Sequence, residues 1–193
     1  MKAPKKGLVF VLSAPAGTGK TTLMKMLQEE FPHVVGSISC TTRHARHNEI
    51  NGRDYHFISP DDFNKRLAAG EFLEHASVFD HQYGTLRNSV EDLQKKGHHV
   101  FLVIDTQGAM QIKEKIPAIF IFIAPPSFEE LKNRLGKRQT ETHEVMQKRI
   151  AWAKHEMEMI SHYDYLIVNE NLATAYQVLR SIVIAEEHRT DKN

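Results

Sequence analysis

The chain has 193 residues, enough for one sizeable core with small inserted subdomains, and its 41% hydrophobic and 25% charged residues are typical of globular proteins. Its 25 Lys and Arg residues nearly balance its 24 Asp and Glu residues, so the net charge of +1 does not indicate a nucleic-acid-binding or membrane-surface protein. One cysteine, Cys40, excludes an internal disulfide framework, and no apolar run approaches the roughly 20 residues of a membrane span.

The first predicted elements are a strand, a tight loop and a helix. The apolar run 8–12 comes directly before residues 14–21, and apolar side chains then recur at helical spacing between residues 23 and 31. This context is typical of a phosphate-binding loop, because the loop N–H groups and the helix N-terminus converge on an anion. In the pattern G-x-x-x-x-G-K-[ST], the lysine reaches the β- and γ-phosphates and the hydroxyl binds Mg²⁺.

The loop has one departure from that pattern. Ala14 stands in place of the first glycine, so the backbone there must tolerate a small Cβ, whereas Gly19, Lys20 and Thr21 are in register. The alternative interpretation is a glycine-rich turn that only joins a strand to a helix.

An insertion of short, partly exposed strands is predicted next, within residues 36–88. Strand patterns occur at residues 37–40, 55–58 and 71–74. Because the insertion breaks the alternation of strands and helices, it is a candidate substrate module.

Several polar side chains of this insertion are candidates for binding a nucleotide. Arg43, Arg46 and Arg53 cluster with Tyr55, and arginine forks suit a phosphate monoester, although a solvated basic face would have the same composition. Glu74, Tyr83 and Thr85 could contact a base edge and a phosphate, but each singly is more often ordinary structure.

The remaining pattern predicts an α/β fold. Continuous apolar runs at residues 100–104, 118–124 and 165–168 indicate strands buried on both faces, as in a parallel sheet under helices. Asp105 follows the first of these runs, at the sheet edge where ligands of such folds bind. The last helix is predicted over residues 172–187.

Two helix starts and a break in the pattern precede that last helix. Ser59 and Ser127 each begin a helix-capping sequence. Arg134 and Arg138 are four residues apart and are predicted to lie on one helix face, followed by a polar stretch that could form a mobile cover, with Arg149 on the next helix. A lysine-bearing loop, an arginine pair and further arginines meet the needs of phosphoryl transfer, which requires positioning and charge neutralisation.

Residues 39–58 carry the most specific pattern of the chain. They match T-T-R-x-x-R-x-x-E-x-x-G-x-D-Y-x-F, and in this the chain resembles the acceptor-binding signature of guanylate kinases. The resemblance covers about residues 7–187. It implies a P-loop NTPase fold of three α/β/α layers with a parallel central sheet, an inserted GMP-binding subdomain and a mobile lid. The implied domain spans residues 6–187, divided into a core (6–35, 89–130 and 150–187), a GMP-binding insertion (36–88) and a lid (131–149), with a tail at 188–193.

The resemblance also implies roles for individual residues. The matched positions that bind the GMP phosphate or face the guanine are Ser39, Arg43, Arg46, Tyr55, Glu74, Tyr83, Thr85 and Asp105. Those that bind ATP are Ala14, Pro15, Ala16, Gly17, Thr18, Gly19, Lys20, Thr21, Thr22 and Asn169, and Thr21 is the Mg²⁺ ligand. The catalytic positions are Lys20, Arg43, Arg134, Arg138 and Arg149. A carboxylate at Glu74 would accept hydrogen bonds from guanine N1–H and the exocyclic amine, which adenine does not offer as a pair.

The chain departs from the family at two further positions. Ala16 stands where serine is usual, and Val103 stands where the family commonly has a second carboxylate. We expect Asp105 or water to cover that gap.

The activity implied is ATP + GMP → ADP + GDP with Mg²⁺, dGMP also being accepted, by a cytoplasmic monomer or homodimer that binds neither nucleic acid nor membrane. Two alternatives remain at this point. Guanylate-kinase-like domains also serve as protein-interaction modules, in which the phosphate loop has decayed, and a related kinase could take AMP or UMP as acceptor. Lys20 and Thr21 favour the enzyme, and Glu74 favours GMP.

Overall fold

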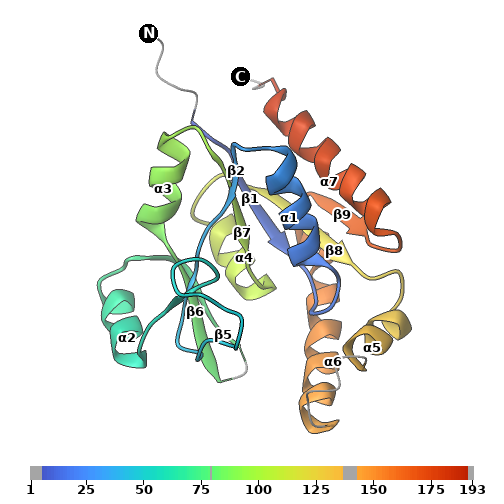
Figure 1. Cartoon of the computed structure of the whole chain (residues 1–193), viewed down its shortest axis with the longest axis horizontal. Coiled ribbons are helices and arrows are strands. Elements are labelled where there is room, and N and C mark those ends of the chain that lie inside the picture. Colours follow the sequence, from blue (N-terminus) through green and yellow to red (C-terminus); the bar gives the residue numbers. More distant parts are fainter. Residues whose placement is uncertain (1–5, 79, 137–142, 191–193) are drawn as a thin grey trace. The chain divides into compact units, whose positions relative to one another are not determined.

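The computed structural model describes residues 6–78, 80–136 and 143–190 (Figure 1). Strands and helices alternate along most of the chain. The strands are β1 (Val9–Ser13), β2 (Val34–Gly36), β3 (Cys40–Thr41), β4 (His56–Phe57), β5 (Phe72–Val78), β6 (His81–Leu86), β7 (His99–Val103), β8 (Ile119–Ala124) and β9 (Tyr165–Val168). The helices are α1 (Lys20–Glu30), α2 (Pro60–Ala68), α3 (Arg87–Lys95), α4 (Thr106–Lys113), α5 (Phe128–Gly136), α6 (His143–Glu158) and α7 (Leu172–Glu187), with a 3₁₀ turn at Ile160–His162.

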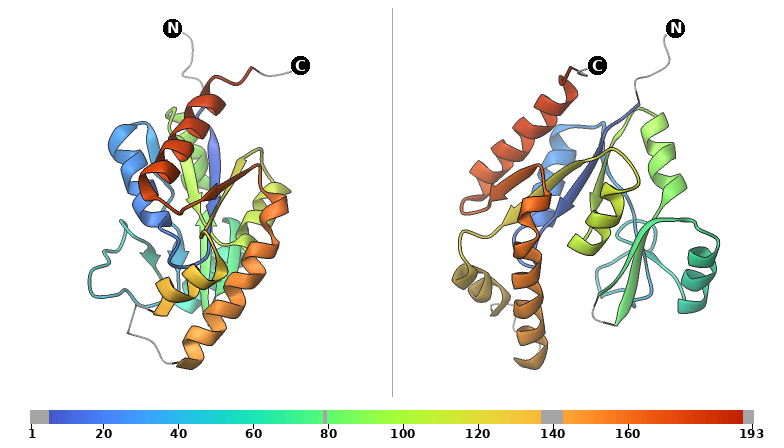
Figure 2. Two further views of the ribbon diagram at one scale, coloured as in Figure 1. Left: turned by 90° about the vertical axis from the view of Figure 1, so that its right-hand side faces the viewer. Right: turned by 180° about the vertical axis from the view of Figure 1, so that it is seen from behind.

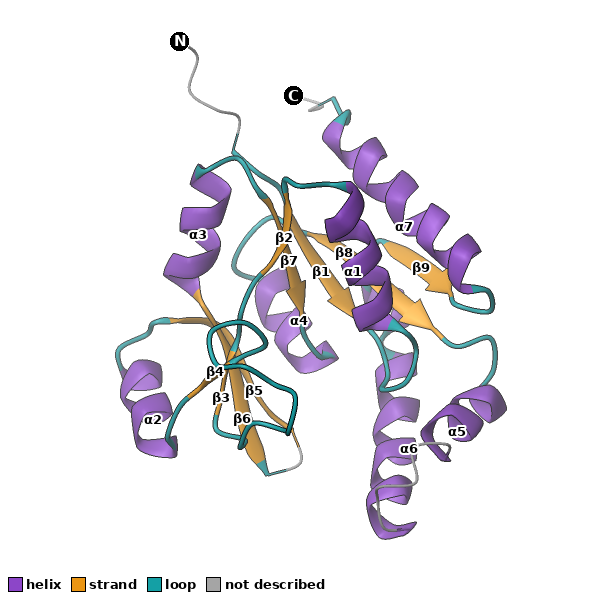
Figure 3. Cartoon of the chain, viewed as in Figure 1, coloured by secondary structure: helices purple, strands orange, loops and turns teal. Residues whose placement is uncertain are grey.

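The strands form two sheets (Figure 3). The larger has five strands in the order β2-β7-β1-β8-β9, and its pairs β2–β7 and β8–β9 are parallel. The smaller has four strands in the order β4-β3-β6-β5, with an antiparallel β5–β6 hairpin. The predicted α/β class with a central parallel sheet is confirmed, since the buried runs of β1, β7 and β8 form its strands.

The chain divides into two compact units that share strand β1. The first unit contains residues 1–11 and 33–118, and the second contains residues 12–32 and 119–193. Within the described residues, no helix is both long and apolar enough to cross a membrane.

In the first unit, aromatic packing fixes both sheets. Phe10 stacks on Phe101 with ring centroids 4.6 Å apart. Phe63 of α2 stacks on Phe72 of β5 at 4.5 Å, so α2 closes the core of the small sheet. Ser59 caps α2 as predicted, because its side chain accepts a hydrogen bond from the Asp62 N–H.

In the second unit, α1 and α7 pack side by side (Figure 2). Glu30 at the end of α1 accepts hydrogen bonds from the Tyr176 hydroxyl and from Arg180 Nε of α7. Helix α7 has the bounds that the sequence predicts. Ser127 caps α5 as predicted, since its hydroxyl accepts from the Glu130 N–H at 3.1 Å.

The prediction of a strand over residues 37–40 was wrong for most of its length. Strand β3 contains only Cys40 and Thr41, because the Ser37 N–H donates to the Phe101 carbonyl and the chain leaves the large sheet there before it enters the small one. The strand predicted at 71–74 is longer than expected, since β5 continues to Val78.

Candidate functional site

The phosphate-loop segment of the second unit is built around two glycines in the left-handed region. Gly17 has φ 86° and Gly19, the N-cap of α1, has φ 90°. L-residues with a side chain rarely adopt this conformation, so the pattern needs glycine at both positions. Ala14 is buried and is not among the described residues with positive φ, which agrees with the expectation that a small Cβ is tolerated there.

Side chains of the loop fold back onto its own backbone. Lys20 Nζ donates to the Ala14 carbonyl at 2.8 Å, and Thr18 Oγ1 donates to the Pro15 carbonyl at 2.9 Å. These bonds hold the lysine ammonium next to the first residue of the predicted motif. Ala16 is exposed, as are Thr21 and Thr22 in the first turn of α1, which are two hydroxyls of the predicted ATP site.

Asn169, which follows β9, contacts this loop, and Arg134 of α5 contacts Asn169. Asn169 is buried, and its Nδ2 donates to the Thr18 carbonyl at 2.6 Å. Arg134 of α5 donates from Nη1 and Nη2 to the Asn169 carbonyl at 3.3 and 3.2 Å, while its Nε donates to Glu130 at 2.8 Å. The structure therefore brings Arg134, Asn169 and the loop together, as expected of one binding element.

The structure describes only one of the other two predicted catalytic arginines, Arg149 and Arg138. Arg149 lies on α6. Arg138 lies outside the described residues, so the predicted pairing of Arg134 and Arg138 on one helix face stays a prediction.

In the first unit, three predicted acceptor-site residues form one hydrogen-bonded chain. Thr85 Oγ1 of β6 donates to Glu74 Oε1 of β5 at 2.5 Å, and Ser39 Oγ lies 3.3 Å from Thr85 Oγ1. Glu74 and Thr85 are cross-strand partners, which is why residues far apart in sequence meet. The carboxylate of Glu74 is thereby held in a fixed orientation.

The Glu74 carboxylate is buried, with 2% of the residue exposed. Burial raises its pKa to about 7, with a smaller contribution in the same direction from the nearby Asp105 charge, while the Thr85 hydrogen bond acts in the opposite direction. A buried carboxyl group whose pKa lies near 7 and which is hydrogen-bonded to a polar side chain is typical of functional sites.

A second group of predicted residues surrounds the Arg43 guanidinium. Arg43 lies over the Tyr55 ring at 5.5 Å, and the Tyr55 and Tyr83 rings meet at 5.9 Å. Both terminal nitrogens of Arg43 donate to the Glu49 carboxylate at 2.9 Å, and this pair raises the pKa of Arg43 and lowers that of Glu49. The Arg46 N–H donates to the same carboxylate at 2.8 Å, so Glu49 organises both predicted phosphate-binding arginines.

Asp105 follows β7, as predicted, and is the N-cap of α4. Its Oδ1 accepts from the Gly108 N–H at 2.9 Å as the N-cap, and its Oδ2 accepts from Gln107 Nε2 at 3.1 Å. Val103, which takes the place of a carboxylate usual in the resembled family, has an exposed fraction of 36%.

Sequence reasoning missed the part played by Glu49, Gln111 and Lys115. Glu49 stands inside the recognised pattern, so its position was a usable signal for a partner of Arg43. Gln111 and Lys115 contact residues of β5 that lie 36 and 42 positions away, and no local pattern indicates such contacts.

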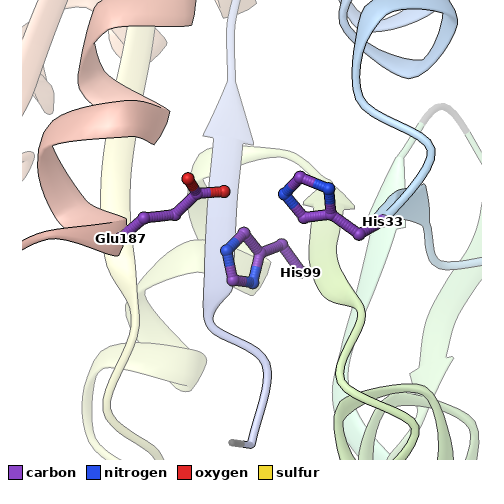
Figure 4. A group of neighbouring side chains, drawn as sticks. All are labelled: His33, His99 and Glu187. Carbon is purple, nitrogen blue, oxygen red and sulfur yellow. The ribbon is translucent and has the colours of Figure 1, made fainter.

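Two neighbouring histidines of the first unit, His33 and His99, are side chains of a type that binds metals. His33 and His99 lie edge to face with ring centroids 5.1 Å apart (Figure 4). His99 Nδ1 is 3.1 Å from the Leu8 backbone nitrogen, which can only donate, so the proton of the neutral ring resides on Nε2. That tautomer leaves no lone pair for a metal, which argues against His99 as a ligand.

Comparison with known proteins identifies what the chain is similar to. The family model described as guanylate kinase matches residues 6–186. A guanylate kinase of Protochlamydia amoebophila is 55% identical over 97% of this chain and 95% of its own length. One from Chlamydia trachomatis serovar D is 48% identical over 94% of this chain and 89% of its own length. The crystal structure of guanylate kinase from Anaplasma phagocytophilum matches with a TM-score of 0.79 and 36% identity, covering 97% of this chain and 89% of that one.

Proposed function

The chain belongs to the guanylate kinase family, and we propose that it transfers the γ-phosphoryl group of ATP to GMP, giving ADP and GDP. The observation that carries the proposal is the hydrogen-bonded chain Ser39–Thr85–Glu74, which presents a buried, oriented carboxylate in the same unit as the Arg43 guanidinium. A protein-interaction module would not need a buried, oriented carboxylate or a guanidinium for binding a nucleotide.

We propose that Glu74 selects the base. Its carboxylate would accept hydrogen bonds from guanine N1–H and the 2-amino group, while Thr85 keeps it oriented. Adenine lacks this donor pair, so binding AMP would leave the buried carboxylate without the two hydrogen bonds from the base, which costs a large factor in kcat/KM.

We propose that the GMP phosphate binds at Arg43, assisted by Arg46, Tyr55, Tyr83 and Ser39. Arg43 has five N–H donors, of which Glu49 and the His44 carbonyl take three. The remaining donors of the fork suit a phosphate, and the aromatic rings keep the guanidinium plane fixed.

ATP is proposed to bind the phosphate loop, with Lys20 and Arg134 on its phosphates and Asn169 behind the loop. Thr21 would hold Mg²⁺: its exposed hydroxyl follows Lys20 in the first turn of α1, and no hydrogen bond of the described residues uses it. Mg²⁺ would supply charge neutralisation on the phosphates. Lys20, Arg43, Arg134, Arg138 and Arg149 would together offset the repulsion between two polyanions and the charge of the transferred group.

The finer features implied by the family are proposals too. They are the division into a core, a GMP-binding insertion at 36–88 and a lid at 131–149, acceptance of dGMP, a cytoplasmic location and a monomeric or homodimeric state.

A coupled ADP-release assay with GMP, dGMP, AMP, CMP and UMP tests the reaction. We expect turnover with GMP and dGMP, which Lys20→Ala should reduce by about 10³-fold. Lys25→Ala, an exposed lysine of the same helix, is the matched control and should retain activity. Absence of turnover together with absence of Mg²⁺-ATP binding would instead favour an interaction module.

A further inference from the structure

Helix α4 covers the outer edge of strand β5 (Figure 3). Strand β5 is the last strand of its sheet, and within the part of the chain that the structure describes it pairs only with β6. Three side chains of the α4 segment bind its other edge. Gln111 accepts from the His75 N–H at 3.2 Å and donates to the His75 carbonyl at 2.6 Å, and Lys115 Nζ donates to the Leu73 carbonyl at 2.7 Å. Gln107 makes the longest of these contacts, 3.4 Å to the Ser77 carbonyl.

The spacing of these contacts follows from the geometry of the two elements. Gln107 and Gln111 are four apart in α4, which is a rise of about 6 Å along a helix, and Lys115 follows in the turn after α4. Their partners 77, 75 and 73 are two apart, which is about 6.7 Å along a strand. The helical and strand repeats nearly match for Gln107 and Gln111, so α4 and the turn after it supply the polar groups that a neighbouring strand would supply.

These contacts lie on both sides of Glu74. Leu73 and His75 are its immediate neighbours in β5. Lys115 binds the Leu73 backbone, and Gln111 binds the His75 backbone. The same helix also bounds the carboxylate: a Cβ added at Gly108 would lie 2.4 Å from Glu74 Oε2. Helix α4 therefore fixes the strand that carries Glu74 and limits where its side chain can move.

We propose that Gln111 and Lys115 are positioning residues for base recognition, which hold the β5 backbone on both sides of Glu74 and so orient its carboxylate for guanine. This inference rests on the proposed role of Glu74. Groups held in their bound orientation before the ligand arrives lose less entropy on binding, and an edge-to-edge hydrogen-bonded base is sensitive to small displacements. Loss of either side chain should therefore weaken the discrimination between GMP and AMP more than it weakens the use of ATP.

The test compares Gln111→Met and Lys115→Met with Lys113→Met, an exposed lysine of the same helix. For each variant, kcat/KM is measured with GMP and with AMP, together with KM for ATP and the melting temperature. We expect the GMP-to-AMP ratio of kcat/KM to fall about tenfold in the first two variants. The ratio in Lys113→Met and the KM for ATP in all three should stay within about twofold of the parent. Lys115→Arg, which keeps a donor, should restore most of the ratio.

Two results would overturn the inference. One is a lower melting temperature in Gln111→Met and Lys115→Met with an unchanged GMP-to-AMP ratio, which would make the contacts purely structural. The other is rapid hydrogen exchange of the His75 amide in the parent protein, with or without GMP, which needs no variant to fold. The variant Glu74→Gln distinguishes failure of the proposed role of Glu74 from failure of the positioning role of Gln111 and Lys115. If it keeps the preference for GMP, the proposed role of Glu74 fails, whereas if it loses that preference while both Met variants retain it, only the present inference fails.

Discussion

The proposed phosphate loop of the second unit and the proposed acceptor region of the first unit are built by different means. The loop is contiguous in sequence, and its shape depends on backbone conformation at Gly17 and Gly19. The acceptor region is assembled from side chains of β5, β6 and the segments around β3, and its central group is Glu74, held by Thr85. One region presents backbone groups and a single lysine, and the other presents carboxylates, hydroxyls and a guanidinium.

This difference determines how each region can fail. Backbone donors cannot be removed by changing a side chain, so the loop should be sensitive mainly to substitutions that alter its conformation. Side-chain donors and acceptors can be changed singly, so the acceptor region should lose specificity in separate steps. Nucleotide-specific effects of the variants below would confirm this contrast, and equal effects on ATP and GMP would contradict it.

The largest effect is expected from Gly19→Ala. A Cβ at this position, where φ is +90°, would lie 2.6 Å from Asn169 Nδ2. Both the backbone strain and the collision with a buried side chain should distort the loop, and kcat/KM for ATP should fall about 100-fold. Steady-state kinetics with ATP varied at saturating GMP measures it.

Gly70→Ala is the matched control for this variant. Its φ is +67°, but nothing lies within 4 Å of the added Cβ. It shares the backbone strain without the collision, so it should lower stability by about 1 kcal/mol and leave the kinetics unchanged. Equal losses of activity in both variants would show that the contact with Asn169 has no role.

The next effect is expected from Gly108→Ala on the acceptor side. The added Cβ would lie 2.4 Å from Glu74 Oε2 and 3.1 Å from its Cδ, so the carboxylate must move. We expect kcat/KM for GMP to fall about tenfold to 100-fold, with the KM for ATP unchanged. Alanine favours a helix more than glycine by about 1 kcal/mol, so loss of α4 would not explain the result. An unchanged KM for GMP would show that this carboxylate does not contact the base.

A smaller effect is expected from pH, through the same carboxyl group. Burial raises the pKa of Glu74 to about 7, and only the ionised form accepts two hydrogen bonds from guanine. The kcat/KM for GMP should therefore fall about tenfold per pH unit below pH 7. The phosphates of GMP and AMP also titrate in this range. The ratio of kcat/KM for GMP to kcat/KM for AMP cancels this shared effect. In Glu74→Gln this ratio should be small and independent of pH.

The raised pKa of Glu74 affects stability in the opposite direction: a rise in pH favours recognition of GMP but lowers the free energy of unfolding. The folded-state pKa of Glu74 is raised above its ordinary value of 4.5, so between about pH 4.5 and 7 the folded protein binds a proton that the unfolded chain has released. This contribution to the free energy of unfolding falls as the pH rises through that window. Glu74→Gln should thus raise the melting temperature at pH 8 relative to the parent, while it weakens guanine recognition.

The two regions also differ in how far the sequence predicts them. The sequence predicts the strand, tight loop and helix of this region, because Gly17, Gly19 and Lys20 form a local motif, and the structure has β1, two glycines with positive φ and α1 there. Helix α7 was predicted with its bounds, since its buried residues recur at helical spacing. The edge contacts of Gln111 and Lys115 could not be predicted, because they join residues 36 and 42 positions apart through backbone groups that every sequence has. The sequence also underestimates the length of β5, because the polar residues His75 and Ser77 interrupt the apolar pattern. The outer edge of this strand is covered by side chains of α4 and the turn after it.

The smallest effect is expected from Glu49→Gln, and its direction distinguishes two roles for the carboxylate. Arg43 and Glu49 are 13% and 19% exposed at the side chain and form a two-bond pair. If Glu49 competes with phosphate for Arg43, the neutral amide should lower the KM for GMP. If Glu49 holds one edge of the guanidinium so that the other edge faces the phosphate, the KM should rise. We expect a rise of about fivefold, because a mostly buried arginine that loses its partner also loses part of its fixed orientation.

Asp54→Asn provides the control for Glu49→Gln within the same insertion. Asp54 pairs with Arg53 at 2.8 Å, but the Arg53 side chain is 59% exposed and the pair is open to solvent. Exposed pairs contribute about 0–1 kcal/mol, so this variant should leave the KM for GMP within about twofold. The KM for GMP is measured for both variants at low and high salt, since competition for the phosphate would weaken as salt screens it, whereas loss of orientation would persist. A KM that falls in Glu49→Gln and approaches the parent value at high salt would therefore assign Glu49 the competing role.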